Sequence, residues 1–217
     1  MTSEQFSEQK RARMALFIDC TYELIEEIGY NEISIRRIAD RAGYHNSSIY
    51  FYFSDLDQLL ALASVRYFEE YSKSLASISS LYSGDADVFY PIWECFCKFA
   101  FERPHVYKLF FFGKYGENIT ALLNQYYAIF PEEKREYSAV VREMYFSNTF
   151  KDRCRAILLP LIHTPWARLS TEAVDLVNEL SIAYFKSLLD EKCTDSALDN
   201  EELTTRFMQA LHYLVDL

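Results

Sequence analysis

The chain has 217 residues, half of them apolar and a quarter charged, which is the balance of an ordinary globular protein. With only five glycines and five prolines, the composition argues against a collagen-like chain, a disordered linker protein and a turn-rich β-sandwich. The net charge of −10 argues against a chain that is basic throughout, the usual balance of a nucleic-acid-binding domain.

No apolar run approaches the ~20 residues that cross a bilayer, and residues 1–14 lack the apolar core of a secretory signal. We therefore expect a cytoplasmic protein that does not associate with membranes. The five cysteines contain no CxxC pair, and the four histidines are scattered along the chain. This spacing predicts reduced thiols, no metal site and no cofactor.

Apolar residues recur at helical spacing along almost the whole chain, which predicts an all-α fold. Gly29 and Gly43 are placed to end the first two helices, while Ser34 can cap the second helix and Ser54 or Asp55 the fourth. We expect helices over about residues 8–28, 35–42, 46–53, 56 to the break at 83–85, 87–102, 104–112, 117–129, 132–147, 150–162, 171–190 and 200–215.

The second and third predicted helices, joined through Ala42-Gly43-Tyr44, form a helix-turn-helix pattern. Gly43 tolerates the backbone conformation that a steep turn between two helices requires. The exposed face of the third helix is then free to enter a DNA major groove. Many helical proteins contain such a corner with nothing bound to it, so the surrounding residues decide the interpretation.

Those residues resemble the N-terminal domain of TetR-family transcriptional regulators over about residues 10–63. The resemblance is carried by Gly29-Tyr30, Ser34–Ala39, Ala42-Gly43, Ile49–Phe53 and Leu59-Leu60. It implies a ligand-controlled DNA-binding dimer. The implied domains are a three-helix DNA-binding domain, residues 1–55, and a helical effector-binding and dimerisation domain, residues 56–217.

The resemblance also implies which side chains contact DNA. Independently of the family, an arginine can bind guanine, and an asparagine adenine, through two hydrogen bonds. The alternative is that these residues are only core aromatics and a solvated helix face. The contacts that we expect are, at phosphates, Ser34, Tyr50 and Tyr52; at base edges or nearby phosphates, Arg36, Asn46 and Ser48; and, beside them, Arg37 and His45.

Two positions depart from the family pattern. Leu56 stands where the family usually has a basic residue aimed at a phosphate, and Phe51 where it commonly has histidine. The first sixty residues carry six basic and ten acidic side chains. We therefore expect few phosphate contacts per subunit and a shallow dependence of DNA affinity on salt.

The 24 residues from Phe89 to Phe112 include ten aromatics. Aromatic rings leave irregular gaps between helices, and a pocket lined by them would suit a flat apolar or aromatic ligand. The alternative is that the rings are simply the core. The pocket residues that we expect are Trp93, Phe96, His105, Tyr107, Phe110, Phe111, Tyr126, Tyr145 and Trp166.

The last two predicted helices carry apolar seams at three- and four-residue spacing. Two such hairpins, one from each subunit, can pack as a four-helix bundle about a two-fold axis. The alternative is packing within one chain. A two-fold dimer predicts a palindromic DNA site. The interface residues that we expect are Val177, Tyr184, Leu188, Phe207, Leu211 and Leu214.

The sequence thus predicts a ligand-responsive regulator: a homodimeric repressor that a small apolar or aromatic effector releases from a palindromic operator in double-stranded DNA. A second hypothesis is a ligand-binding or adaptor protein on the same fold with weakened or lost DNA binding, which Leu56, Phe51 and the acidic balance favour. An enzyme is not expected, because no nucleophile motif, phosphate loop or metal cluster is evident in the sequence.

Overall fold

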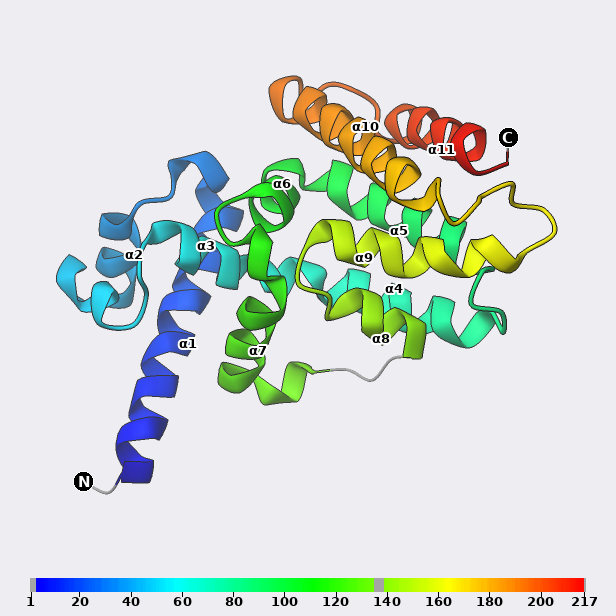
Figure 1. The fold of residues 1–217 in the computed structure, drawn as a ribbon. Coiled ribbons are helices and arrows are strands. Elements are labelled where there is room, and N and C mark those ends of the chain that lie inside the picture. The colour runs from blue at the N-terminus through cyan, green and yellow to red at the C-terminus, as the bar shows by residue number, and fades with distance from the viewer. Residues whose placement is uncertain (1–2, 135–138, 217) are drawn as a thin grey trace. The chain divides into compact units, whose positions relative to one another are not determined.

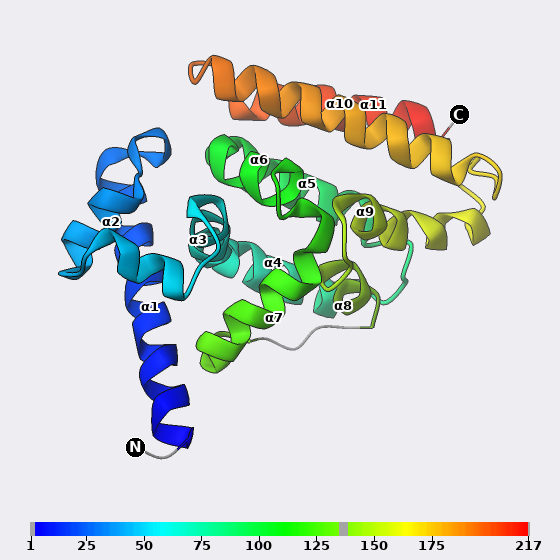
Figure 2. The same ribbon diagram turned by 60° about the vertical axis from the view of Figure 1, so that its left-hand side comes forward.

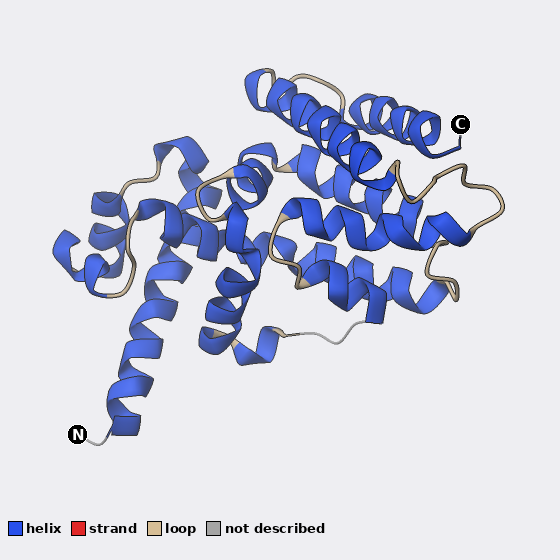
Figure 3. Cartoon of the chain, in the orientation of Figure 1, coloured by secondary structure: helices blue, strands red, loops and turns tan. Residues whose placement is uncertain are grey.

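The computed structural model of the chain describes residues 3–134 and 139–216, and within these residues every element is a helix (Figures 1 and 3). The predicted all-α fold is confirmed. None of the helices in the described part of the chain is long and apolar enough to span a membrane.

Contacts between residues divide the chain into two compact units. The N-terminal unit comprises the residues up to Glu69 together with Ala121–Lys134, and the C-terminal unit comprises Glu70–Thr120 together with the residues from 135 onwards. The division of function between residues 1–55 and 56–217 stays a prediction, because compactness does not tell where one function ends.

The N-terminal unit is built around α1 (Ser3–Ile28), against which α2 (Ile35–Ala42) and α3 (Leu56–Ser64) pack (Figures 1 and 2). Phe17 of α1 is fully buried. The ring centroids of Tyr44, Tyr52 and Phe53 lie 5.5, 5.9 and 6.3 Å from that of Phe17. One aromatic ring on α1 therefore anchors both the turn and the segment that follows it.

Local capping sets the boundaries of the short helices. The Ser34 side chain accepts a hydrogen bond from the backbone N–H of Arg37, and Gly43 ends α2 in the left-handed region with φ 74°. Asp55, rather than Ser54, caps α3 by accepting from the backbone N–H of Gln58 at 2.8 Å. These caps confirm the predicted start and end of α2.

Two predicted helices differ in the structure. The third is a 3-10 helix over Asn46–Phe51, a geometry common in very short helical pieces. The long fourth helix is interrupted: after α3 a 3-10 turn covers Val65–Tyr67 before α4 (Phe68–Leu81) begins. The Ser64 hydroxyl donates to the Leu60 carbonyl at 2.7 Å, a bond of the kind that bends helices.

The seventh helix, α7 (Ile119–Ile129), contributes most of its length to the N-terminal unit. There Arg66 pairs with Asp19 of α1 at 2.5 Å and lies over the Phe130 ring, 4.9 Å from its centroid. The Tyr126 hydroxyl donates to Glu133 at 2.5 Å. A polar network thus joins this part of the chain to α1.

In its described residues, the C-terminal unit contains most of α4 and six further α-helices (Figures 1 and 2). The α10–α11 pair is antiparallel, with α10 against α6 and α9 and α11 against α5. The six helices are α5 (Phe89–Glu102), α6 (Pro104–Phe112), α8 (Ala139–Tyr145), α9 (Phe150–Leu158), α10 (Val174–Thr194) and α11 (Asn200–Asp216).

Most of these helices match the prediction, with three differences. Residues 135–138 of the helix expected over 132–147 lie outside the described residues. The helix expected over 150–162 changes to a 3-10 turn at Leu159–His163, because Pro160 has no backbone N–H to donate. The helix expected to end at residue 190 continues to Thr194, which shortens the loop before α11.

Interlocked aromatic rings fill the core of the C-terminal unit. The Phe96 ring lies 5.0 to 5.9 Å, between centroids, from those of Trp93, Phe111, Phe150 and Phe185. The five rings come from α5, α6, α9 and α10, so the core ties four helices together. All five cysteines are free thiols, and burial raises the pKa of each, as expected for reduced cysteines.

Candidate functional site

The helix-turn-helix presents a polar and aromatic surface. The two arginines Arg36 and Arg37 on α2 are exposed, and in the 3-10 segment Tyr50 and Phe51 are 57% and 79% exposed. Neighbouring exposed aromatic side chains of this size are typical of interaction surfaces. The surface carries the chemistry for recognising nucleic acid, since it combines cationic, hydrogen-bonding and planar groups.

Every arginine of α2 is paired with a carboxylate. Arg36 lies 3.7 Å from Asp40, and Arg37 lies 3.7 Å from Glu32. More than half of each of these four side chains is exposed. Pairs this open contribute little to stability, so a phosphate group can displace the carboxylates at small cost.

Arg41 is held more firmly than the other two. It pairs with Glu27 through both terminal guanidinium nitrogens and with Glu23 at 3.3 Å, and both carboxylates belong to α1. The hydrogen bonds from Arg41 lower the pKa of Glu27. Arg41 therefore fastens α2 to α1, and the arginines of α2 whose pairs are open to solvent are Arg36 and Arg37.

The remaining predicted DNA contacts differ in how free their polar groups are. Ser34 is occupied as the α2 cap, and the His45 ring accepts from the Ser47 backbone N–H at 3.3 Å. Asn46 and Ser48 are half-buried on the 3-10 segment. Tyr52 is half-buried against Phe17, whereas Tyr50 is open to solvent. The structure thus brings all eight residues to one corner of the N-terminal unit.

Basic residues at the start of α1 extend this corner. Gln9, Lys10 and Arg13 line a groove together with Phe51 and Tyr52, and the Arg13 guanidinium lies over the Tyr44 ring, 4.5 Å from its centroid. Lys10 and Arg13 belong to a short basic run in the sequence, and this run is the sequence feature that indicates them. Phe51, which departs from the family pattern, lines the same groove.

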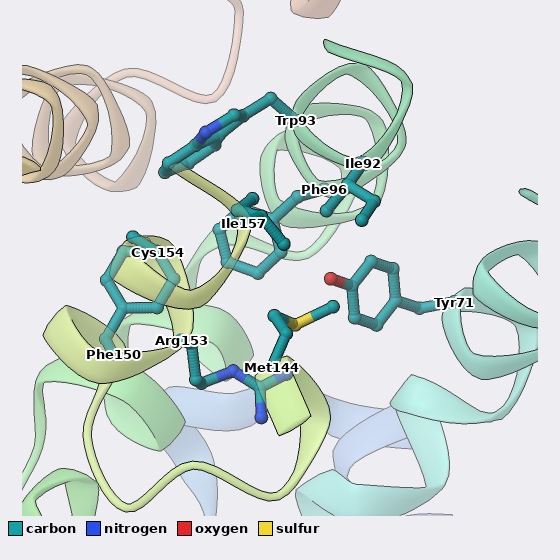
Figure 4. Close-up of a pocket in the computed structure, with 9 residues that line it drawn as sticks. All are labelled: Tyr71, Ile92, Trp93, Phe96, Met144, Phe150, Arg153, Cys154 and Ile157. Atoms are coloured by element: carbon teal, nitrogen blue, oxygen red, sulfur yellow. The ribbon is translucent and has the colours of Figure 1, made fainter. Parts of the chain in front are cut away.

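A second candidate site is a cavity inside the C-terminal unit (Figure 4). Its volume is about 20 Å³, close to the smallest that holds one water molecule. The lining residues come from α4, α5, α8 and α9 and are Tyr71, Ile92, Trp93, Phe96, Met144, Phe150, Arg153, Cys154 and Ile157.

Two of the predicted pocket residues, Trp93 and Phe96, line this cavity. Four others are buried elsewhere in the core of the same unit: Tyr107, Phe110, Phe111 and Tyr145. The last three are not brought to it: Tyr126 belongs to the N-terminal unit, His105 is half-buried on α6, and Trp166 is 41% exposed.

Arg153, the one cationic residue that lines the cavity among the described residues, was not predicted from the sequence. Arg153 is 3% exposed. It stands three residues after Phe150 and four before Ile157, so it lies on the apolar face of α9. A charged residue inside an apolar stripe at helical spacing was a signal that the sequence contained.

The predicted dimer residues face the interior more than solvent. Four of them are buried within the chain: Val177, Leu188, Phe207 and Leu211. Tyr184 and Leu214 are half-buried. The exposed apolar side chains of α10 and α11 are Leu176, Leu180 and Tyr213, at 59, 46 and 69%.

Comparison with known proteins agrees with this arrangement at the helix-turn-helix. A family model described as bacterial regulatory proteins of the tetR family matches residues 17–63, which run from the middle of α1 nearly to the end of α3. No curated protein matches the chain in sequence.

Solved structures similar over the whole chain include the complex of RolR with its ligand resorcinol, with TM-score 0.61 and 19% identity over 99% of this chain and 91% of that one. A TetR transcriptional regulator from Rhodococcus sp. RHA1 has a TM-score of 0.55 and 13% identity, over 96% of this chain and 97% of that one. SmeT, the repressor of the Stenotrophomonas maltophilia multidrug efflux pump SmeDEF, has a TM-score of 0.54 and 12% identity, over 93% of this chain and 89% of that one. At these identities the likeness establishes the fold alone.

Proposed function

We propose that this chain, a DNA-binding transcriptional regulator whose N-terminal domain is that of the TetR family, is a homodimeric cytoplasmic repressor of a palindromic operator. A small aromatic effector bound in the C-terminal unit releases it from DNA. The match of the family model to residues 17–63, where the structure forms a helix-turn-helix with exposed Arg36 and Arg37, carries the proposal.

The operator contacts are assigned to the corner where the eight predicted residues meet. The 3-10 segment Asn46–Phe51 enters the major groove, where Arg36 and Asn46 read base edges. Tyr50 and the basic residues at the start of α1 contact phosphates. Since Arg41 is held by α1, each subunit makes few phosphate contacts, and the dependence of affinity on salt is shallow.

The dimer is assigned to the outward stripe of α10 and α11. Leu176, Leu180 and Tyr184 recur at four-residue spacing along α10, and Tyr213 and Leu214 lie near the end of α11. The row along α10, with exposed Tyr213 on the adjacent α11, supports packing against a second copy as a four-helix bundle. The dimer then spaces the two recognition segments for successive major grooves.

The effector response is a population shift between conformations with different spacings of the two recognition segments. The ring-lined cavity around Trp93 and Phe96 supports a small aromatic effector. RolR, which has a similar fold, forms a complex with resorcinol, a one-ring ligand, and this supports the proposal. SmeT, which shares the fold, is a repressor.

The test is selection of random double-stranded DNA by the purified full-length protein, read by sequencing. The informative variant is Arg36→Ala, and the matched control is Arg155→Ala, since Arg155 is also paired with a carboxylate, Asp175, at 2.9 Å in the other unit. We expect a palindromic sequence that the parent protein and Arg155→Ala select and Arg36→Ala does not. No enriched sequence from a folded dimer at low salt would favour the adaptor function instead.

The dimer is tested by light scattering of Leu180→Glu. A buried, unpaired carboxylate at a packed interface is strongly unfavourable, so this variant should elute as a monomer. Leu81→Glu, at an exposed leucine of α4, is the matched control and should stay dimeric. A dimeric Leu180→Glu protein would place the interface elsewhere.

A further inference from the structure

The cavity of the C-terminal unit contains a positive charge that its surroundings do not neutralise. Arg153 is 3% exposed, and arginine stays protonated in proteins. Among the described residues, no carboxylate forms an ion pair with it. Burying an unpaired charge is costly, so the guanidinium needs compensation from other groups.

The compensation within the chain is incomplete. One guanidinium nitrogen donates to the backbone carbonyl of Tyr145, and the guanidinium lies over the rings of Phe111 and Tyr145, 5.3 and 5.2 Å from their centroids. Both interactions are favourable. A guanidinium has five N–H donors, however, and one carbonyl occupies only one of them.

The other cavity walls supply no negative charge. Burial raises the pKa of the Tyr71 hydroxyl and of the Cys154 thiol well above their ordinary values, so both stay neutral near pH 7. Figure 4 shows the Tyr71 hydroxyl directed into the cavity, where it can act as a hydrogen-bond donor. The remaining lining residues are apolar side chains.

We propose that this cavity binds a small aromatic carboxylate, with the carboxylate on the Arg153 guanidinium and the ring among Trp93, Phe96 and Phe150. An arginine holds a carboxylate through two parallel hydrogen bonds, which is the chemistry that the cavity lacks without a ligand. The inference rests on the proposed function, because it names the class of effector for the site assigned there.

The cavity must widen to admit a ring, since about 20 Å³ accommodates a single water molecule. Met144 is the movable wall. It lies between the Arg153 guanidinium and the Tyr71 hydroxyl in the view of Figure 4, and methionine side chains adapt readily to a new neighbour. Because Tyr71, Met144 and Arg153 line the same cavity, we expect a ligand that takes the place of the Met144 side chain to contact both polar groups.

The test is a fluorescence titration of the full-length Trp166→Phe protein, in which Trp93 is the only remaining tryptophan and reports on the cavity. The probes are benzoate, its neutral analogue benzamide, and resorcinol. We expect benzoate to bind about 10- to 100-fold more tightly than benzamide, the range that a charge-assisted hydrogen bond provides. Arg153→Met should abolish this preference, and Arg153→Lys should keep part of it.

Thermal melting of Arg153→Met shows whether the variant is folded before it is titrated, and Met144→Ala provides a second variant with a wider cavity. Met144→Ala should bind benzoate more tightly than the parent. Benzamide binding as tightly as benzoate, or a preference that survives in folded Arg153→Met, would overturn the proposal. So would the absence of benzoate binding in Met144→Ala.

The two proposals fail separately. If resorcinol but not benzoate binds and releases the selected operator, the repressor function stands and the carboxylate class is wrong. If benzoate binds through Arg153 but no DNA sequence is ever selected, the ligand class stands and the repressor function is wrong.

Discussion

The arginines of the two units occupy opposite environments. On α2 of the N-terminal unit, Arg36 and Arg37 are exposed and each has a carboxylate 3.7 Å away. In the C-terminal unit, Arg153 is 3% exposed and has a backbone carbonyl and two rings for partners. The exposed arginines, which water already stabilises, are thus paired with carboxylates, whereas the buried Arg153 has no carboxylate partner among the described residues.

This contrast separates two ways of preparing a site for an anion. An exposed pair is weak because water screens it, so in the proposed DNA complex a phosphate replaces Asp40 or Glu32 without loss of fold stability. The Arg153 guanidinium, by contrast, is largely removed from water at 3% exposure. Its unfilled donors favour a ligand that brings its own negative charge into the cavity.

The largest expected effect concerns the stability of the C-terminal unit. Phe185, a fully buried ring, is a pure packing residue, and Phe185→Ala should lower the free energy of unfolding by about 3–5 kcal/mol. Arg153→Met should change it by less than about 1 kcal/mol or raise it, since relief of the buried charge offsets the lost hydrogen bond. Urea unfolding followed by circular dichroism measures both. An equal loss of unfolding free energy in the two variants would show that Arg153 stabilises the fold as much as a packing residue does, and would contradict the difference drawn here between the two kinds of arginine.

On the DNA side, removing the competing carboxylates should strengthen binding. The double variant Glu32→Gln, Asp40→Asn frees Arg37 and Arg36, and we expect about 3- to 10-fold higher affinity for the selected operator at low salt, the combined worth of two exposed pairs. Fluorescence anisotropy with labelled operator measures the change. Asp85→Asn, Glu102→Gln removes the same charge from exposed positions of the C-terminal unit and should gain less. An equal gain in both variants would show a general charge effect.

Much of the N-terminal unit was predictable because its signals are local. Ser34 caps α2 and Gly43 ends it in the left-handed region, and both residues have these roles for reasons that act within one turn of the chain. The break after Ser64 was not predicted, because apolar spacing continues through it. Nothing in the sequence distinguishes Ser64, whose hydroxyl donates to the Leu60 carbonyl, from the other serines.

The C-terminal unit was less predictable because its contacts are long-range. Periodicity identified Leu188, Phe207 and Leu211 as one apolar face, but it cannot tell whether the same chain or a second copy covers that face. In the structure the chain itself buries them. Arg153 shows the same limit. Its place on the apolar face of α9 was readable from the sequence, whereas its lack of a carboxylate partner within residues 3–134 and 139–216 depends on helices far apart in sequence.

The contribution of the Arg41–Glu27 pair to stability can be measured through its dependence on pH. The hydrogen bonds from Arg41 lower the pKa of Glu27 from its ordinary 4.5. A lowered pKa in the folded state adds stability that is present above pH 4.5 and is lost as the pH falls through the lowered value. Glu27→Gln should therefore melt slightly below the parent protein at pH 7, and the difference should vanish in acid. A difference that persists there would show that Glu27 acts by packing.

The smallest expected effect is that of pH on the affinity for benzoate, which should be absent. If Arg153 has no internal counter-ion, the affinity for benzoate should not change between pH 6 and 9, because the Tyr71 hydroxyl and the Cys154 thiol both keep their protons over that range. Burial likewise raises the pKa of the half-buried Cys95, on α5, to about 11. The fluorescence titration, repeated across this range, measures the response. A loss of affinity above pH 8 that Cys154→Ser removes would reveal a thiolate paired with Arg153, and the cavity would then contain its own anion.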